Sequence, residues 1–350
     1  MSSHPHPSRF FLAAALAAAC AQALAAPQEV HFFTLENDAH FGTDRFYTNG
    51  VQWSAKHTDD RRGARTKQLT ASVCAWLACG DATLLTTQTN VGQLMYTPRD
   101  ITIASPQPQD RPWAGLLYLE QSWTLLSPDQ RSLTTLSSQI GVTGRWSLAE
   151  PTQKLIHQLL DRNAPQGWDQ QIGGTVGLLA SAERRTALDA MSLDLGHDVR
   201  LNTASYWRLA AGNLQTYAAA GLAIVIGKDL PTVSPPPPGI SNKLRAQDAA
   251  LSSCLVPWLR CTAFGSVEAR VVAYNIFLDG RLLHEDSGVS HRSLVHDLVF
   301  GTRIDFPNTR SDSHGPWFLQ WKVTRRSPEF RSSLPVPRHR VMAVTIGTEF

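Results

Sequence analysis

The sequence lacks a long hydrophobic run outside its N-terminus and lacks a strong excess of charge. The longest apolar run beyond residue 25 is Tyr217 to Gly227, which has eleven residues. A helix that crosses a bilayer needs about 20, so this composition argues against a helical membrane protein. Charged residues make up 17% of the chain and the formal net charge is +3. This balance is too weak to indicate a nucleic-acid partner.

The sequence also lacks the common short motifs of catalytic and cofactor sites. It contains no Gly-x-Ser-x-Gly, no phosphate-binding glycine loop and no His-Glu-x-x-His. Four histidines in the second half of the chain are scattered without the spacing of metal ligands. We expect them to face solvent or the lumen of the fold: His197, His284, His291 and His296.

The first residues have the pattern of a secretory signal peptide. Arg9 precedes a short apolar core, and Ala23-Leu24-Ala25 forms a small-x-small cleavage site. A membrane anchor is disfavoured because the apolar core is shorter than a spanning helix. We therefore predict that residues 1–25 are cleaved and that residues 26–350 form the mature, exported domain.

Four cysteines remain after cleavage, and they form two close pairs. Cys74 lies near Cys79, and Cys254 lies near Cys261. An even number in an exported protein indicates disulfides, each contributing no more than roughly 2–3 kcal/mol because the loops are short. Zinc is disfavoured because no histidine lies beside either pair at finger-like spacing.

Alternation of apolar and polar residues runs through the mature chain. In the last ten residues Met342, Val344, Ile346 and Phe350 share one face. Repeated segments of this kind predict an all-β, 12-stranded antiparallel transmembrane β-barrel, with a soluble sandwich as the alternative. An even number of strands returns both ends to the periplasm. The predicted strands are residues 28–38, 47–57, 84–96, 113–125, 132–143, 171–181, 186–208, 215–227, 263–277, 293–306, 316–328 and 339–350.

This topology places residues 39–46, 97–112, 144–170 and 209–214 at the extracellular rim. It places a short turn at 183–185 and long loops at 58–83 and 228–262 on the periplasmic side. The loop 144–170 contains the one convincing helix, from Pro151 to Leu160. Its apolar face is formed by Leu155, Ile156, Leu159 and Leu160, and His157 lies on the flank of that face.

The rim connections bring candidate site residues together. His157 is a candidate base, although a lone histidine on a short helix is more often a surface residue. Asp38 and Asn37 offer oxygens suited to calcium, but an Asx turn that only closes a hairpin is an equal alternative. Thr48 lies on the same rim. Glu36 points the other way and is interpreted as structural.

Three rim arginines are candidates for binding phosphate. Arg45, Arg99 and Arg111 all fall on predicted extracellular connections. An arginine guanidinium pairs with phosphate through a fork of donors. The alternative is that all three are solvated loop charges.

A series of motifs extends over nearly the whole mature chain. They are Glu36-Asn37-Asp38, Thr43 to Gly50, Tyr96-Thr97-Pro98, Asp110 to Gly115, Gly141 to Gly144, Gln153 to His157, Gly167 to Gln171, Gly212 to Leu214 and Glu329-Phe330. Taken together, these motifs resemble the outer-membrane lipid A 3′-O-deacylase family. The resemblance implies a twelve-stranded barrel that removes the 3′-acyloxyacyl group of lipid A with calcium. It implies Asn37, Asp38, Thr48 and His157 as active-site residues, and it leaves Asp44, Arg45, Asn49 and Gly50 to the turn.

Two positions depart from the family pattern. The loop 97–112 contains no lysine, where the family's characterised type has one. The acidic residue expected soon after His157 has no clean match, since Asp161 is near but Asn163 is closer in register.

The leading hypothesis is a calcium-dependent esterase in the Gram-negative outer membrane, acting on lipid A of lipopolysaccharide in the outer leaflet. The alternatives are a phospholipid esterase of the same architecture and a non-catalytic channel or structural barrel. The sequence leaves acyl-chain preference and oligomeric state open.

Overall fold

The computed structural model describes residues 28–58, 82–228, 230–234, 260–284, 287–306 and 317–349. The predicted signal peptide lies outside these residues, as do Cys74, Cys79 and Cys254. Only Cys261, the second residue of a strand, is described. The cleavage and the two cysteine pairs therefore stay predictions.

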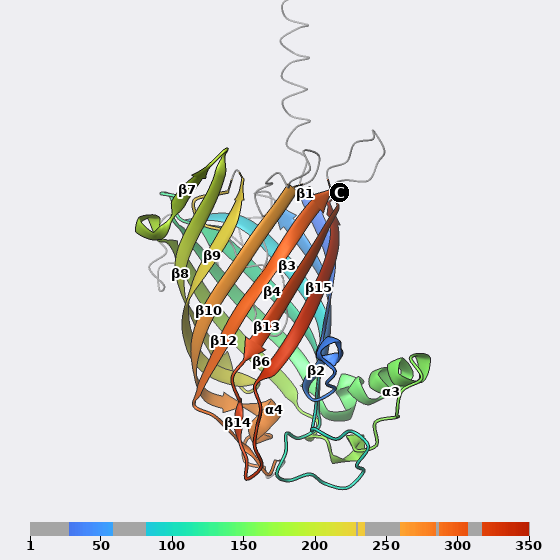
Figure 1. Cartoon of the computed structure of the whole chain (residues 1–350). Coiled ribbons are helices and arrows are strands. Elements are labelled where there is room, and N and C mark those ends of the chain that lie inside the picture. The colour runs from blue at the N-terminus through green and yellow to red at the C-terminus, as the bar shows by residue number, and fades with distance from the viewer. Residues whose placement is uncertain are drawn as a thin grey trace, which may run out of the picture.

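The chain forms a closed barrel of twelve antiparallel strands, as the sequence predicts (Figure 1). The first and last strands pair with each other, with Leu35 opposite Val344, and this pairing closes the wall. The barrel strands are β1 (Gln28–Asn37), β2 (Phe46–Thr58), β3 (Thr83–Thr97), β4 (Ala114–Leu126), β5 (Ser132–Thr143), β6 (Val176–Ala187), β8 (Val199–Gly212), β9 (Gln215–Lys228), β10 (Arg260–Asn275), β12 (Leu294–Phe306), β13 (Trp317–Arg326) and β15 (His339–Glu349).

Shorter elements lie at the two ends of the barrel. The strand β7 (Leu193–Gly196) pairs antiparallel with the start of β8 at the end that carries the C-terminus (Figure 1). The strand β11 (Ser290–His291) pairs with β14 (Phe330–Arg331) at the opposite, extracellular end. The helices are η1 (Ala39–Phe41), η2 (Gly144–Ser147), α3 (Ala149–Leu159), η3 (Trp168–Gln170), η4 (Asp189–Met191) and α4 (Ile276–Asp279). Within the described residues no helix has the length and apolarity to cross a membrane.

Two strand predictions are wrong in their bounds. The predicted strands 171–181 and 186–208 are β6 at 176–187 and β8 at 199–212. The charged run 183–185 is not a turn, because Glu183 and Arg185 are buried and face the barrel interior from β6. Arg208 on β8 donates from Nε to Glu183 Oε2 at 2.9 Å. In the sequence alone, a run of charged residues that face a polar lumen cannot be told from the charged residues of an exposed turn.

The interior of the barrel is filled by paired charges. Arg326 donates from Nε to Asp297 Oδ1 at 2.8 Å, and Lys322 Nζ lies 3.1 Å from Glu36 Oε1. Burying an ion is costly unless a partner and hydrogen bonds compensate it. These pairs therefore let alternate residues of each strand carry charge inward while the opposite face stays apolar. Glu36 belongs to this paired interior, where it also accepts a hydrogen bond from the Tyr47 hydroxyl at 2.9 Å.

The extracellular end of the interior is packed with aromatic and aliphatic side chains. Phe277 of α4 stacks on Tyr96 of β3 with 4.6 Å between ring centroids. The Arg111 guanidinium carbon lies 4.3 Å from the centroid of the same tyrosine. Asn275 caps α4 by accepting a hydrogen bond from the Phe277 N–H, which holds that ring in place. This packing closes the lumen beneath the extracellular loops.

Candidate functional site

The helix α3 lies on the outside of the barrel wall at its extracellular end (Figure 1). It packs against β3 and β4. Its buried residues are Ala149, Gln153 and His157, spaced four apart on one face. The apolar stripe of the helix is on the outside, since Leu155 is 56% exposed and Leu159 is 74% exposed. The polar face contacts the wall and the leucines point away from it.

His157 is held from both ring nitrogens. Its Nε2 lies 3.1 Å from Asp44 Oδ2, and its Nδ1 lies 2.6 Å from the carbonyl oxygen of Asn163. A carbonyl oxygen only accepts, so Nδ1 carries a hydrogen. A carboxylate also only accepts, so the contact between Nε2 and Oδ2 requires one further proton. The His157–Asp44 pair therefore holds a shared proton at the outer surface of the wall.

Burial raises the pKa of Asp44, while the charges of His157 and Arg162 and hydrogen bonds from His157 and Thr48 oppose that rise. A carboxyl group with a raised pKa retains a proton more readily than an exposed one. This fits the shared proton that the geometry requires.

A β-bulge turns Thr48 toward this pair. Tyr47 pairs with Tyr96 and Asn49 pairs with Met95, so Thr48 is the extra residue of β2. A bulge changes the direction in which the following side chains point. The Thr48 hydroxyl consequently lies 2.6 Å from the Thr97 hydroxyl and bonds to Asp44, rather than facing the lumen with Gln52, four residues later on the same strand.

Asp38 is fully buried in the loop between β1 and β2. Its Oδ2 accepts hydrogen bonds from the Thr43 hydroxyl at 2.6 Å and from the Arg45 N–H at 3.0 Å. Burial raises the pKa of Asp38 to about 7, partly offset by these bonds, and the nearby Asp44 adds to the rise. Asn37 forms the Asx turn that the sequence pattern allows as the alternative to a calcium site. Its Oδ1 accepts a hydrogen bond from the Ala39 N–H at 2.6 Å.

Two buried oxygens in this loop fit a hard cation. Asp38 Oδ1 and Asp44 Oδ1 both lack a hydrogen-bond partner in the described part of the protein. Carboxylate oxygens are preferred calcium ligands, and a cation would compensate their burial. Asn37 Oδ1 already accepts a backbone hydrogen bond. No group of three or more acidic, histidine or cysteine side chains with metal-binding geometry occurs among the described residues. Carbonyl oxygens or water would have to complete a site.

Sequence comparison identifies the family. Residues 10–345 match the family described as outer membrane protein LpxR. The chain belongs to the LpxR family. It is therefore an outer membrane protein, in agreement with the resemblance and localisation predicted from the sequence.

Two solved structures are similar to this LpxR-family chain, and the first of them has the same fold. LpxR from Salmonella typhimurium is 18% identical with a TM-score of 0.70, covering 91% of this chain and 99% of that one. The β domain of the Bordetella autotransporter BrkA is 8% identical with a TM-score of 0.42, covering 93% and 98%. No curated protein matches the sequence.

The three predicted phosphate-binding arginines of this LpxR-family chain lie in different environments. Arg45 donates its N–H to Asp38, and its Nε is buried without a partner in the described residues. Arg99 donates to the Pro335 carbonyl oxygen at 2.7 Å and ties two loops together. Arg111 is 1% exposed and its Nη1 lies 2.9 Å from Glu329 Oε2. The burial of Arg111 contradicts its predicted place among the exposed arginines of the rim. Arg45 is therefore the candidate phosphate-binding residue that lies beside the site.

Sequence reasoning missed two residues of this arrangement. Asp44 was assigned to the turn, because nothing in a local pattern shows that a loop carboxylate will meet a helix about 110 residues later. For Gln153 the sequence predicts no role of its own beyond a place in a motif. Its Oε1 accepts from Trp168 Nε1 at 2.8 Å, and its Nε2 is buried without a partner in the described residues. The available signal was its position one helical turn before His157.

Proposed function

We propose that this LpxR-family barrel is a calcium-dependent esterase that removes the 3′-acyloxyacyl group of lipid A in the outer leaflet. The observation that carries the proposal is the position of the His157–Asp44 pair. It lies between the outer wall of the barrel and a helix whose leucines Leu155 and Leu159 are exposed toward the lipid. A hydrolytic group at this place meets a membrane lipid, whereas a group in the lumen would meet only water.

The geometry supports a water-mediated reaction. The pair acts as the base in the form that has lost the shared proton. Nε2 of His157 then accepts the proton of a water molecule as the water oxygen attacks the ester carbonyl carbon, which restores the shared proton. The pair then returns the proton to the departing sugar oxygen as the acyl–oxygen bond breaks, which yields a free carboxylic acid and a 3′-hydroxyl. Thr48, bonded to Asp44, orients the pair and the water.

Two groups would stabilise the developing negative charge. Gln153 has its amide oxygen fixed by Trp168, which leaves Nε2 as an available donor for the oxyanion. Calcium, when bound by Asp38 and Asp44, would polarise the ester carbonyl. Arg45 is the proposed contact for a lipid A phosphate because of its charge and its unpaired Nε.

The alternatives differ in what they predict. A passive channel needs an open path, and the packing of Phe277 on Tyr96 fills the extracellular end of the lumen. A phospholipid esterase would use the same groups, so substrate decides between the two enzymes.

The test is mass spectrometry of lipid A from cells that express the protein with calcium. We expect loss of the 3′-acyloxyacyl group with the wild-type protein and no loss with His157→Ala. Asp169→Asn is the matched control, because Asp169 is an exposed carboxylate of the same loop that pairs with Arg145. Full deacylation by His157→Ala would contradict the mechanism. Release of fatty acid from phosphatidylethanolamine vesicles with intact lipid A would contradict the substrate.

A further inference from the structure

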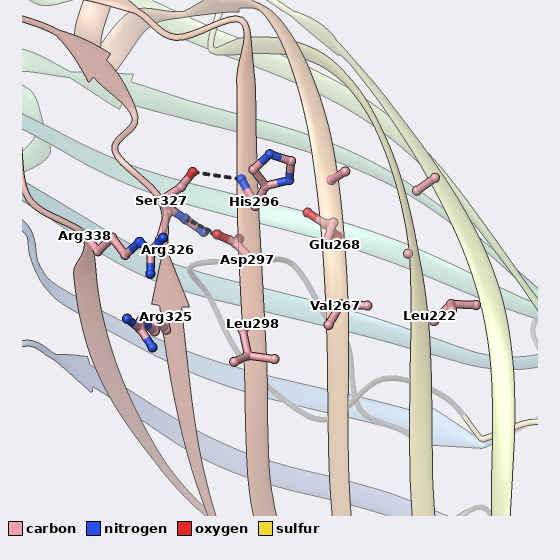
Figure 2. A pocket seen from close by; sticks show the side chains of 13 residues that line it. Leu222, Val267, Glu268, His296, Asp297, Leu298, Arg325, Arg326, Ser327 and Arg338 are labelled. Atoms are coloured by element: carbon pink, nitrogen blue, oxygen red, sulfur yellow. Dashed lines mark hydrogen bonds and ion pairs between the residues drawn. The ribbon is translucent and has the colours of Figure 1, made fainter.

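A hollow of about 620 Å³ lies on the outer surface of the barrel, over β9, β10, β12 and β13 (Figure 2). Small outward-facing residues, Ala220 and Ala269, are paired at its centre. Leu222, Val267 and Leu298 form a continuous apolar row, since Val267 is in register with both leucines. A depression between leucine and valine side chains on a lipid-facing wall is suited to an acyl chain.

Basic side chains line one edge of this hollow. Arg325 is in register with Leu298 on one side and with Arg340 on the other. Arg338 lines the hollow beside Arg325 (Figure 2). All three arginines are exposed. Like charges directly opposite each other on neighbouring strands are destabilising. An anion between the guanidinium groups would reverse that effect.

The carboxylates of the same strands do not compensate these arginines. Glu268 and Asp297 are buried toward the lumen, where Arg270 Nη2 lies 2.7 Å from Glu268 Oε1 and 2.9 Å from Asp297 Oδ2. Among the described residues, neither Arg325 nor Arg338 forms an ion pair. The outer face of this sector is therefore apolar with a purely positive edge.

The positive edge lies at the extracellular limit of the apolar belt. The outward residues of β13 are Trp317, Leu319, Trp321 and Val323, followed by Arg325 near the end of the strand. At about 3.3 Å per residue the strand from Trp317 to Arg325 is roughly 26 Å long, which at a tilt of about 40° spans roughly 20 Å of the membrane. The apolar band of an outer-membrane barrel is about 25 Å tall. Arg325 is thus placed near the outer limit of this band, where a long arginine side chain reaches the lipid headgroups.

We propose that this hollow binds a lipid A molecule at a second, non-catalytic site, with acyl chains over Ala220 and Ala269 and a phosphate between Arg325 and Arg338. A phosphate monoester carries up to about two negative charges, which suits several arginines better than the single charge of a phosphodiester. Lipid A has phosphate monoesters and is the lipid of the leaflet that Arg325 faces.

This site is separate from the candidate catalytic site. Three steps around the wall lead from β3, which packs on α3, to β15, which begins directly after Arg338, and five steps lead to β12. At about 4.8 Å per step these are roughly 14 and 24 Å. The proposal rests on the outer-membrane placement and on the hollow, and it holds whether or not the chain cleaves esters.

The experiment is native mass spectrometry of the full-length mature protein in detergent, titrated with bisphosphorylated lipid A. The His157→Ala protein is used so that no ligand is consumed. We expect two lipid A molecules per chain. In the background of His157→Ala, Arg325→Gln with Arg338→Gln should leave one, with at least a tenfold weaker second binding event. Ala269→Phe, which fills the hollow and keeps its charge, should do the same.

Arg331→Gln is the matched control, because Arg331 is an exposed extracellular arginine outside the hollow. Heat-modifiable gel migration verifies that each variant is folded. Two molecules bound to the Arg325→Gln, Arg338→Gln protein would overturn the proposal. Equal occupancy by phosphatidylglycerol would overturn the assignment to lipid A. A failure of deacylation in the wild-type protein alters neither result, so the two proposals fail separately.

Discussion

His157 and Asp44 meet across two separate segments, with 3.1 Å between Nε2 of the histidine and Oδ2 of the aspartate. One residue lies on α3, outside the wall, and the other lies in the loop that joins β1 to β2. The carbonyl oxygen of Asn163 occupies the other ring nitrogen at 2.6 Å. Because both partners of the imidazole are acceptors, the ring orientation and the shared proton depend on Asp44.

Asp44→Asn should lower the rate of deacylation by about 10²-fold, in the range of lost acid–base catalysis. The amide cannot share the proton and can donate to Nε2, which occupies the lone pair that a base needs. The measurement is the pH dependence of kcat/KM on purified lipid A. Asp44→Asn should change the shape of the profile, whereas Asp169→Asn should leave it unchanged. An unchanged profile for Asp44→Asn would assign that residue to loop structure alone.

The strand number and the end to which each loop belongs followed from the sequence, because alternation at period two is a local property. The orientation of α3 did not follow. An apolar stripe normally faces the protein, but on the outside of a membrane barrel the apolar environment is the lipid. Leu155 and Leu159 therefore point outward, and the polar Gln153 is buried.

Long-range contacts and irregular pairing were also beyond the sequence. The bulge at Thr48 depends on the register of β2 against β3, which no local pattern specifies. Arg111 had the composition of a rim loop, yet it is buried because a partner, Glu329, lies beside it from a loop about 220 residues later. For Asn37 and Asp38, likewise, no local pattern shows which donors reach each side chain.

Glu329→Gln should destabilise the barrel. Glu329 accepts from Arg111 at 2.9 Å and from Arg326 at 3.1 Å, and removing one charge of a buried group of this kind costs about 3–5 kcal/mol. Burial alone would raise the pKa of Glu329, but these arginines lower it from 4.5 to about 2. Its contribution is therefore complete above pH about 4.5 and is lost as pH falls through about 2.

Urea titration followed by tryptophan fluorescence measures this effect at several pH values. The wild-type protein should lose its advantage over Glu329→Gln toward pH 2. Arg111→Gln should reduce the free energy of unfolding comparably while leaving the affinity for lipid A unchanged. A selective loss of lipid affinity in Arg111→Gln, at normal stability, would return that residue to the substrate-binding set.

Leu155→Ser with Leu159→Ser should loosen α3 from the membrane. Burying one leucine in an apolar phase is worth about 1.5–3 kcal/mol, so the pair is a large part of what holds the exposed stripe in lipid. Hydrogen exchange of residues 149–159 in nanodiscs should quicken by at least tenfold. Gln158→Ser, an exposed polar position of the same helix, is the control. Equal protection in both variants would mean that contacts to the wall alone hold α3.

Calcium should stabilise the folded protein through Asp38. A ligand that binds only the folded state at 100 times its dissociation constant adds about 2.7 kcal/mol to the free energy of unfolding. We expect calcium to raise the thermal transition of the wild-type protein and chelation to abolish both this rise and the deacylation. Asp38→Asn removes one of the two carboxylates of the loop between β1 and β2 that have an unpaired buried oxygen in the described structure, so it should require at least tenfold more calcium for either effect. Asp100→Asn, an exposed extracellular carboxylate that bonds Thr102, is the control. An undiminished calcium response in Asp38→Asn would exclude Asp38 as a calcium ligand. The burial of its carboxylate would then not be compensated by calcium.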